Sequence, residues 1–291
     1  MYTAYYQLCE KPFALTPDPR FLFLSLSHRE ALAHVIYGIE QGEGFIAVTG
    51  EVGTGKTTLC RTLLDRLGSG AEVAFIFNPT LSGEELLRAI SMEYGLPEAK
   101  RTRAELNDQL NRFLLDAKAA SRRVVLVVDE AQNLSRETLE EIRLLSNLET
   151  STSKLIQIAL FGQPELDAKL DSPGLRQLRQ RISVRWRLSP LSYAESGEYV
   201  RHRVRVAAGC DRDLFAPSAL REIARRARGI PRLLNLLADR SLLAGYVDHA
   251  GRVERAHVGQ AAREILSTCR RPRNVRHGRA AKVGSVAEER A

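Results

Sequence analysis

Eight residues that follow a short apolar segment have the spacing of a phosphate-binding loop. The string Gly50-Glu51-Val52-Gly53-Thr54-Gly55-Lys56-Thr57 matches G-x-x-x-x-G-K-[ST] between an expected strand and an expected helix. The glycines let backbone N–H groups turn toward phosphate oxygens, and the helix N-terminus adds a favourable dipole. Lys56 would reach the β- and γ-phosphates, and the Thr57 hydroxyl would bind Mg²⁺. The alternative is a glycine-rich turn with a chance Lys-Thr pair.

Two adjacent carboxylates follow a buried-type segment, Val124 to Val128. An enzyme with such a loop needs one acid to hold Mg²⁺ through its water shell, and Asp129 fits this role. It needs a second acid to polarise the attacking water, and Glu130 fits that role. The alternative is a solvated acidic turn after a core strand. The position about 70 residues after the loop favours the catalytic interpretation, and therefore hydrolysis of ATP.

Expected strands and helices alternate through the first two thirds of the chain. The strands are predicted at 45–49, 73–77, 124–128, 155–161 and 182–188, and the helices at 27–41, 56–67, 84–94, 104–120, 135–148 and 175–181. Ser27 is the expected N-cap of the first helix, with Glu30 as its capping-box partner. This alternation predicts an α/β fold with a parallel five-stranded sheet flanked by helices.

After Pro190 only helical spacing remains, at 193–208, 217–228, 231–247 and 254–266, which predicts a small all-helical lid. The aromatic and proline residues near the N-terminus indicate an ordered arm held by its rings. The expected organisation is an arm packing on the core at 1–28, a nucleotide-binding α/β domain at 29–190, a helical lid domain at 191–267 and a basic, disordered tail at 268–291.

Composition excludes several classes of protein. Apolar residues make up 44 % of the 291 residues, and the longest apolar candidate, Val124 to Val128, is far too short to span a bilayer. The N-terminus lacks the basic-then-apolar pattern of a secretion signal. The four cysteines form no C-x-x-C pair, which favours free thiols in a reducing cytoplasm. The net charge is +8, of which the segment 270–291 supplies +5, so the body is nearly balanced.

Several strings in this order resemble the AAA+ superfamily and, more narrowly, the ExeA/GspA family of bacterial secretion-associated ATPases. The match runs from about residue 1 to residue 266. The phosphate loop is generic, whereas the strings near residues 161 and 177 are more specific. The matching strings are Glu10-Lys11-Pro12-Phe13, Thr16-Pro17-Asp18-Pro19-Arg20, Ser27-His28-Arg29-Glu30-Ala31-Leu32, Thr49 to Thr58, Asp129-Glu130-Ala131-Gln132, Phe161-Gly162-Gln163-Pro164-Glu165-Leu166, Gln177-Leu178-Arg179-Gln180-Arg181-Ile182 and Gly229-Ile230-Pro231-Arg232-Leu233-Leu234-Asn235.

The resemblance implies further site residues. Arg181 matches the arginine finger that reaches the γ-phosphate bound by a neighbouring subunit, with Arg179 as the second candidate and a surface arginine as the alternative. Arg232 matches the sensor-2 arginine of the lid. Gln163 is the nearby polar candidate for the first sensor, a position where many relatives carry Asn, Ser or Thr.

The resemblance also implies that the segment before the loop lines the adenine pocket. Val35 and Ile36 fit either that pocket or the plain core, and both readings stay open. Full-length GspA-type proteins continue into a membrane span and a peptidoglycan-binding domain. This sequence resembles the shorter cytoplasmic relatives without those parts.

The leading hypothesis is therefore a cytoplasmic ATPase that binds ATP and Mg²⁺. It would form a homo-oligomeric ring or filament and act on a membrane-bound partner in secretion, pilus or exopolysaccharide assembly, attached to the inner membrane only through that partner. The alternative is a DNA-dependent ATPase of the transposition-helper type that binds double-stranded DNA, suggested by the tail and by four lid arginines: Arg221, Arg225, Arg226 and Arg228. A third reading is a nucleotide-gated switch with negligible turnover, against which Glu130 argues.

Overall fold

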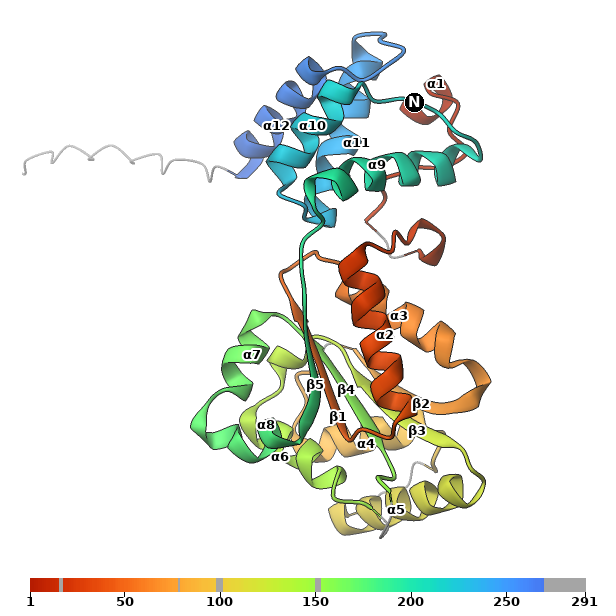
Figure 1. Cartoon of the computed structure of the whole chain (residues 1–291), viewed down its shortest axis with the longest axis vertical. Helices are drawn as coiled ribbons and strands as arrows, with labels where there is room; N and C mark the ends of the chain where they lie inside the picture. Colours follow the sequence, from red (N-terminus) through yellow and green to blue (C-terminus); the bar gives the residue numbers. More distant parts are fainter. Residues whose placement is uncertain (16–17, 78, 98–101, 150–152, 270–291) are drawn as a thin grey trace, which may run out of the picture.

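The computed structural model describes residues 1–15, 18–77, 79–97, 102–149 and 153–269. Figure 1 shows an α/β part below and an all-helical part above, joined at a narrow waist. Five parallel strands form one sheet in the order β2-β3-β4-β1-β5. They are β1 (Phe45–Gly50), β2 (Ala71–Ile76), β3 (Arg123–Val128), β4 (Gln157–Gly162) and β5 (Ile182–Leu188). The expected α/β class and five-stranded parallel sheet are confirmed.

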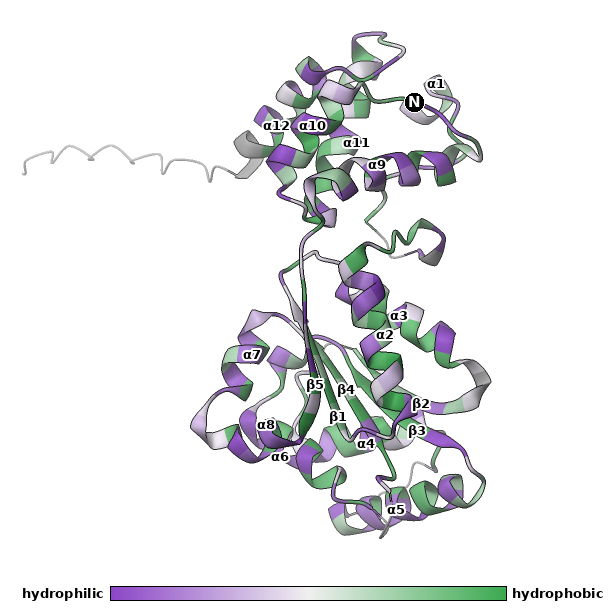
Figure 2. Ribbon diagram, in the orientation of Figure 1, coloured by the Kyte–Doolittle hydropathy of each residue, from purple (hydrophilic) through white to green (hydrophobic). Residues whose placement is uncertain are grey.

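The sheet is buried on both faces because its central strands are apolar on both sides. In β1, Phe45 and Ala47 pack in one core cluster, whereas Ile46 and Val48 pack in the cluster on the opposite face. Successive side chains of a strand point to opposite faces, so this division follows directly from the apolar run. The hydropathy colouring of Figure 2 shows the apolar sheet enclosed by helices whose outer surfaces are mainly polar.

Helices cover both faces of the sheet and connect its strands. α2 (Leu26–Glu40) and α3 (Lys56–Leu67) contribute to the cluster that contains Ile46. On the other face lie α4 (Gly83–Glu93), α5 (Arg103–Ala119), α6 (Arg136–Leu145), α7 (Pro164–Leu170) and α8 (Arg176–Arg181). Capping boxes begin α4 at Ser82 and α5 at Thr102. α7 is absent from the predicted elements.

The helical part consists of α9 (Tyr193–Ala208), α10 (Pro217–Ala227), α11 (Pro231–Val247) and α12 (Arg255–Cys269), with bounds close to those predicted. Ser192 begins α9 with a capping box. Within the described residues, no helix combines the length and apolar character needed to cross a membrane. α12 ends at Cys269, and residues 270–291 of the expected tail lie outside the described residues.

The N-terminal arm, which was expected to pack on the core, packs its aromatic rings on the helical lid, and η1 (Pro19–Phe21) of the arm also contacts α3. Tyr2, Tyr6 and Phe13 are buried in the lid cluster. Tyr2 Oη donates to Asp239 Oδ1 at 2.5 Å, and Tyr6 Oη donates to the carbonyl of Ala250 at 3.1 Å. The arm carries a short helix, α1 (Tyr2–Tyr5), beside α11 (Figure 1). The aromatic residues signalled burial correctly, but rings carry no information on which apolar surface receives them.

The N-cap of the first long helix lies two residues before the expected one. Ser25 is the N-cap of α2, and its side chain accepts a hydrogen bond from the backbone N–H of His28. Ser27 instead accepts from the backbone N–H of Ser189 at 3.1 Å, between the end of β5 and the lid. The predicted capping box of Ser27 and Glu30 is therefore wrong, and Ser25, the serine that replaces Ser27, bonds His28, whose ring contacts the phosphate loop.

Candidate nucleotide site

A cavity of about 390 Å³ lies where the phosphate loop meets the arm and the lid. This volume is within the range of small-molecule sites. The cavity brings together three groups of predicted site residues: the loop after β1, the acid after β3, and the polar residues at the N-terminal ends of α7 and α11. The predicted residues that line it are Val52, Gly53, Thr54, Gly55, Lys56, Thr57, Thr58, Glu130, Gln163 and Arg232.

The loop has the backbone shape that an anion cradle requires. Gly53 and Gly55 have φ values of 79° and 99°, a region that residues with a Cβ rarely adopt. Lys56 is buried, and its Nζ donates to the carbonyls of Gly50 at 2.8 Å and Glu51 at 3.0 Å. Burial lowers the pKa of Lys56, although the charges of Glu130 and Asp129 oppose that shift. The ammonium therefore lies inside the loop.

Thr57 and Asp129 meet at the start of α3. The Thr57 hydroxyl donates to Asp129 Oδ2 at 2.7 Å, and Asp129 is fully buried. Burial raises the pKa of Asp129, while the hydrogen bonds from Thr57 and from the N–H of Glu130 act in the opposite direction. One hydroxyl and one carboxylate beside a phosphate loop are the oxygen ligands that suit Mg²⁺, so these two residues fit the predicted ion.

Glu130 lines the cavity one residue later, in the left-handed region with φ of 54°. Such a conformation is uncommon for a residue other than glycine and is typical of functional sites. Glu130 Oε2 accepts from Gln163 Nε2 at 3.0 Å and from Gln132 Nε2 at 2.5 Å. Partial burial would raise the pKa of Glu130, but these two hydrogen bonds and the charge of Lys56 lower it. Glu130 is therefore held as a carboxylate.

The lid reaches the loop through Arg232, the second residue of α11. Its backbone N–H donates to the carbonyl of Gly53 at 3.4 Å, and its Cβ lies so close to Gly53 that a side chain there would collide with it. The exposed side chain of Arg232 lines the cavity. The structure thus brings this predicted residue to the phosphate end of the site.

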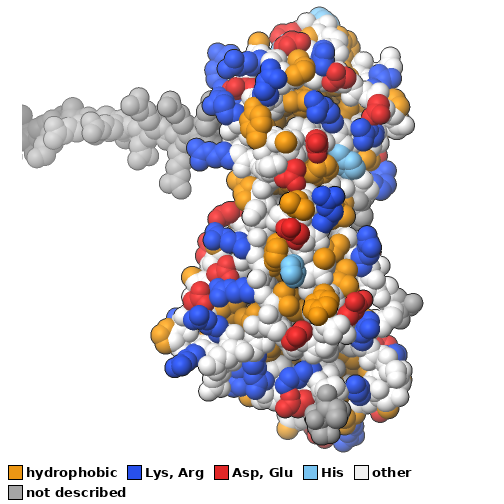
Figure 3. All heavy atoms as spheres, in the orientation of Figure 1, with side chains coloured by type: hydrophobic (Ala, Val, Ile, Leu, Met, Phe, Trp, Pro, Cys, Tyr) orange, Lys and Arg blue, Asp and Glu red, His pale blue; other side chains and the backbone are white. Residues whose placement is uncertain are grey.

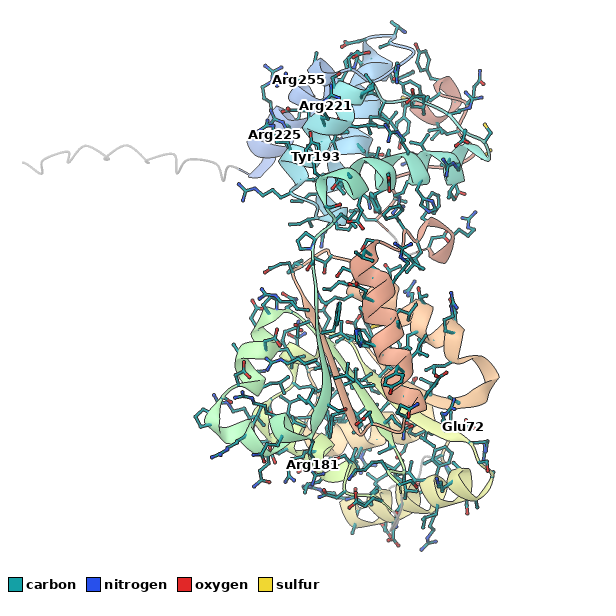
Figure 4. The ribbon with its side chains drawn as sticks, in the orientation of Figure 1. Glu72, Arg181, Tyr193, Arg221, Arg225 and Arg255 are labelled. Carbon is teal, nitrogen blue, oxygen red and sulfur yellow. The ribbon has the colours of Figure 1, made fainter. Side chains whose placement is uncertain are left out.

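Arg181 is not brought into this cavity. It immediately precedes β5, whose first residue, Ile182, pairs with Phe45 at the start of β1, whereas the phosphate loop follows the end of β1. Five residues of strand, roughly 16 Å, separate the two ends. Arg181 Nη1 donates to Ser146 Oγ at 2.8 Å, and Figure 4 labels it low in the α/β part. Arg179 is exposed on the same helix, within 3.5 Å of Asp171. Within one chain neither arginine lines the cavity.

His28 is a site residue that sequence reasoning missed. It is buried at the start of α2, and its Nε2 lies 2.9 Å from the carbonyl of Thr54. A carbonyl can only accept, so Nε2 carries the hydrogen, and Nδ1 lies 2.6 Å from Ser25 Oγ. Burial lowers the pKa of His28, which favours the neutral ring. The string that contains His28 was among those that match the family, but nothing in its spacing indicated a contact between His28 and the phosphate loop.

The far end of the cavity is lined by the arm and the lid. Phe21 and Phe23 from the arm face Tyr199 and Arg203 of α9. The Arg203 guanidinium lies 4.7 Å from the centre of the Phe21 ring, and its Nη2 donates to the carbonyl of Ala14 at 3.2 Å. An aromatic and cationic wall of this kind suits a planar base.

The two residues considered for the adenine pocket lie elsewhere. Val35 is buried in the core cluster on the α2 face of the sheet, and Ile36 packs against that cluster. Neither lines the cavity, so the plain-core reading of these two residues is the one the structure supports.

The sheet order, the loop after β1 and the acid after β3 define an AAA-type P-loop fold followed by a helical region. A family model described as an AAA domain matches residues 39–170. The expected resemblance to the ExeA/GspA ATPases is also confirmed: the chain is 46 % identical over 266 residues to the General secretion pathway protein A of Aeromonas hydrophila. That match covers 91 % of this chain and 48 % of the relative, so the chain spans about half the length of that protein.

Solved structures share the fold at low identity. The Cdc6p protein of Pyrobaculum aerophilum is similar with a TM-score of 0.65 and 17 % identity, covering 87 % of this chain and 70 % of that one. The ORC1 protein of Aeropyrum pernix in complex with DNA gives 0.63 and 20 %, covering 88 % and 69 %. The RuvB Holliday junction branch migration motor of Thermotoga maritima gives 0.54 and 19 %, covering 82 % and 68 %. At these identities the likeness concerns the fold alone.

The buried, neutral state of His28 predicts a pH dependence of stability. The unfolded chain takes up a proton near the ordinary value of 6.5, whereas the folded protein does so only at lower pH. The free energy of unfolding should therefore fall as the pH drops below about 6.5. In His28→Gln that contribution is missing, so the stability difference between wild type and variant should shrink between pH 7.5 and 5.5, measured by urea unfolding.

The matched control is His249→Gln, which changes an exposed histidine of the lid. Its stability should follow the wild-type pH dependence. Parallel pH curves for wild type and His28→Gln would show that His28 is not held neutral.

Proposed function

We propose that the chain binds ATP with Mg²⁺ and hydrolyses it at the loop cavity. The observation that carries this proposal is that the phosphate loop, Glu130 and Arg232 line one cavity although they come from three separate parts of the chain. The loop N–H groups and Lys56 would hold the β- and γ-phosphates. Thr57 and Asp129 would hold Mg²⁺, which supplies charge neutralisation at the phosphates.

Glu130 is the proposed general base. It is held as a carboxylate at the edge of the cavity and is therefore able to orient a water molecule and accept its proton. Gln163 bonds the same carboxylate and lies at the end of β4, where a first-sensor residue is expected. Arg232 would approach the γ-phosphate from the lid and offset its developing charge. The base would lie against Phe21 and Tyr199.

The trans role of Arg181 implies an oligomer. Arg181 lies beside the first residues of β1 and β5, whereas its own phosphate loop follows the last residue of β1. It could therefore complete only the cavity of another copy. Its present hydrogen bonds to α6 would be exchanged for a phosphate oxygen of the neighbouring site. Arg181 is preferred to Arg179 because of its match to the family finger.

The name of the relative supports a proposal for the cellular role. Its name places it in a general secretion pathway, and the chain matches it at 46 % identity. We therefore propose that nucleotide-driven rearrangement of a ring or filament in the cytoplasm assists assembly of a secretion, pilus or exopolysaccharide system. The contact with the inner membrane would be made through a membrane-bound partner.

A second candidate function rests on a basic surface of the lid. Arg225, Arg226 and Arg255 all pair with one buried carboxylate, Glu222, and the hydrogen bond from Arg225 contributes most to lowering its pKa to about 2. One acid therefore faces three guanidinium groups. Figure 3 shows Lys and Arg side chains gathered on this side, and Figure 4 places Arg221, Arg225 and Arg255 together near Tyr193. Such a surface suits the phosphates of double-stranded DNA.

Two substitutions test the proposed hydrolysis. Lys56→Ala should weaken ATP binding by at least about tenfold, because the phosphates lose a charged donor. Glu130→Gln should bind ATP with unchanged affinity yet hydrolyse it roughly 10²- to 10⁴-fold more slowly, because only the base is lost. Nucleotide titration and phosphate release measure the two effects. Equal behaviour of the two variants would contradict the division of roles.

The trans arrangement predicts that activity depends on assembly. The rate per subunit should rise steeply with protein concentration. Arg181→Ala should bind ATP normally and lose about 10³-fold in kcat. Mixed with wild type, it should inhibit more than in proportion to its share. Arg176→Ala, an exposed residue of the same helix, is the control. If Arg179→Ala shows the loss and Arg181→Ala does not, the finger is Arg179.

The DNA reading predicts stimulated turnover at low salt. ATP hydrolysis by wild type would increase with double-stranded DNA, and the combined substitution Arg221→Glu and Arg255→Glu would abolish that increase while leaving basal turnover intact. Arg66→Glu, on α3 of the α/β part, is the charge-matched control. Turnover that does not respond to DNA at low salt rules out this second function and leaves the envelope role.

A further inference from the structure

Gln132 lies four residues after the end of β3, in the short turn of Ala131–Asn133. Its side chain donates one hydrogen bond and accepts another. Its Nε2 donates to Glu130 Oε2 at 2.5 Å, and its Oε1 accepts from the backbone N–H of Gln163 at 3.0 Å. One amide thus joins the carboxylate after β3 to the backbone at the end of β4. An aliphatic side chain could make neither bond, and a carboxylate could make only the second.

The surroundings of Gln132 fix it in this position. Lys169 Nζ of α7 donates to the carbonyls of Gln132 and Leu134, both at 2.6 Å, which ties the turn to α7. The packing around Gly162 is equally close, since a Cβ there would lie 3.1 Å from Gln132 Oε1 and 2.7 Å from a Leu166 methyl group. The side chain is therefore held by its own bonds and by the strand beside it.

We infer that Gln132 is a positioning residue that sets the direction of the Glu130 carboxylate from the end of β4. Gln132 lies outside the cavity lining, so it acts through Glu130 and through Gln163. Both amides donate to the same oxygen, Oε2, and this leaves Oε1 of Glu130 as the oxygen for a proton acceptor. A shift of β4 or α7 would move both donors together and turn the carboxylate with them. The inference rests on the proposed function, in which Glu130 is the base.

Two substitutions separate the two bonds. Gln132→Glu has the same length and keeps an acceptor for the N–H of Gln163, but it cannot donate and places a second carboxylate beside Glu130. Gln132→Ala removes both bonds. Each should lower kcat for ATP about tenfold to hundredfold with KM and ATP affinity unchanged, because misplacement of a base affects turnover and not phosphate binding. Gln41→Ala, at the exposed end of α2, is the control and should match wild type.

A measurement that needs no turnover distinguishes failure of this inference from failure of the proposed function. Hydrogen exchange of the Gln163 backbone amide, followed by NMR in the full chain without nucleotide, should accelerate in Gln132→Ala and stay slow in Gln132→Glu. A wild-type protein that does not hydrolyse ATP would contradict the proposed function. An active wild type with unchanged kcat in both variants, or with unchanged exchange in Gln132→Ala, would overturn the positioning role. In the Glu130→Gln background, Gln132→Ala should cause no further loss of kcat.

Discussion

The site depends on where the carbonyl groups of the phosphate loop point. A loop can turn its N–H groups toward an anion only if its carbonyls turn away, and each buried carbonyl then needs a donor. Donors from three parts of the chain meet this need. Lys56 bonds the carbonyls of Gly50 and Glu51, His28 of α2 bonds that of Thr54, and the N–H of Arg232 bonds that of Gly53. The loop shape is therefore maintained jointly by its own helix, the preceding helix and the lid.

The two acidic residues of the site also depend on their hydrogen-bond partners. Asp129 is buried and bonded by Thr57, whereas Glu130 turns into the cavity in a left-handed conformation. The pKa values of the adjacent carboxylates thus shift in opposite directions. Burial raises the pKa of Asp129, whereas at Glu130 two hydrogen bonds and the charge of Lys56 together outweigh burial and lower the pKa. Such divergence between neighbours is what allows one acid to hold a cation and the other to accept a proton.

The strands and their succession along the chain could be predicted because apolar runs mark buried parallel strands, and β5 was placed at its observed bounds. The loop and the acid pair were found because their spacing is fixed along the chain. Short α7 was missed because seven residues carry too little periodicity. The roles of His28 and Gln132 were not predicted. The loop carbonyl that His28 contacts is distant in sequence, and the bonds of Gln132 depend on the direction of its side chain. The roles of Arg181 and Arg232 stay predictions, although Arg232 lies where its role requires.

The arm gives the lid a second connection to the α/β part. One crossing runs from β5 to α9, and the other runs from the arm to α2. The two crossings are bonded to each other, because the N–H of Ser189 donates to Ser27 Oγ and the N–H of Leu26 donates to Glu195 Oε1 at 2.9 Å. A domain that is attached by two adjacent linker segments rotates less freely than a domain on a single linker. The two bonded crossings thus restrict rotation of the lid relative to the α/β part, and they hold the lid edge that carries Arg232 against the phosphate loop.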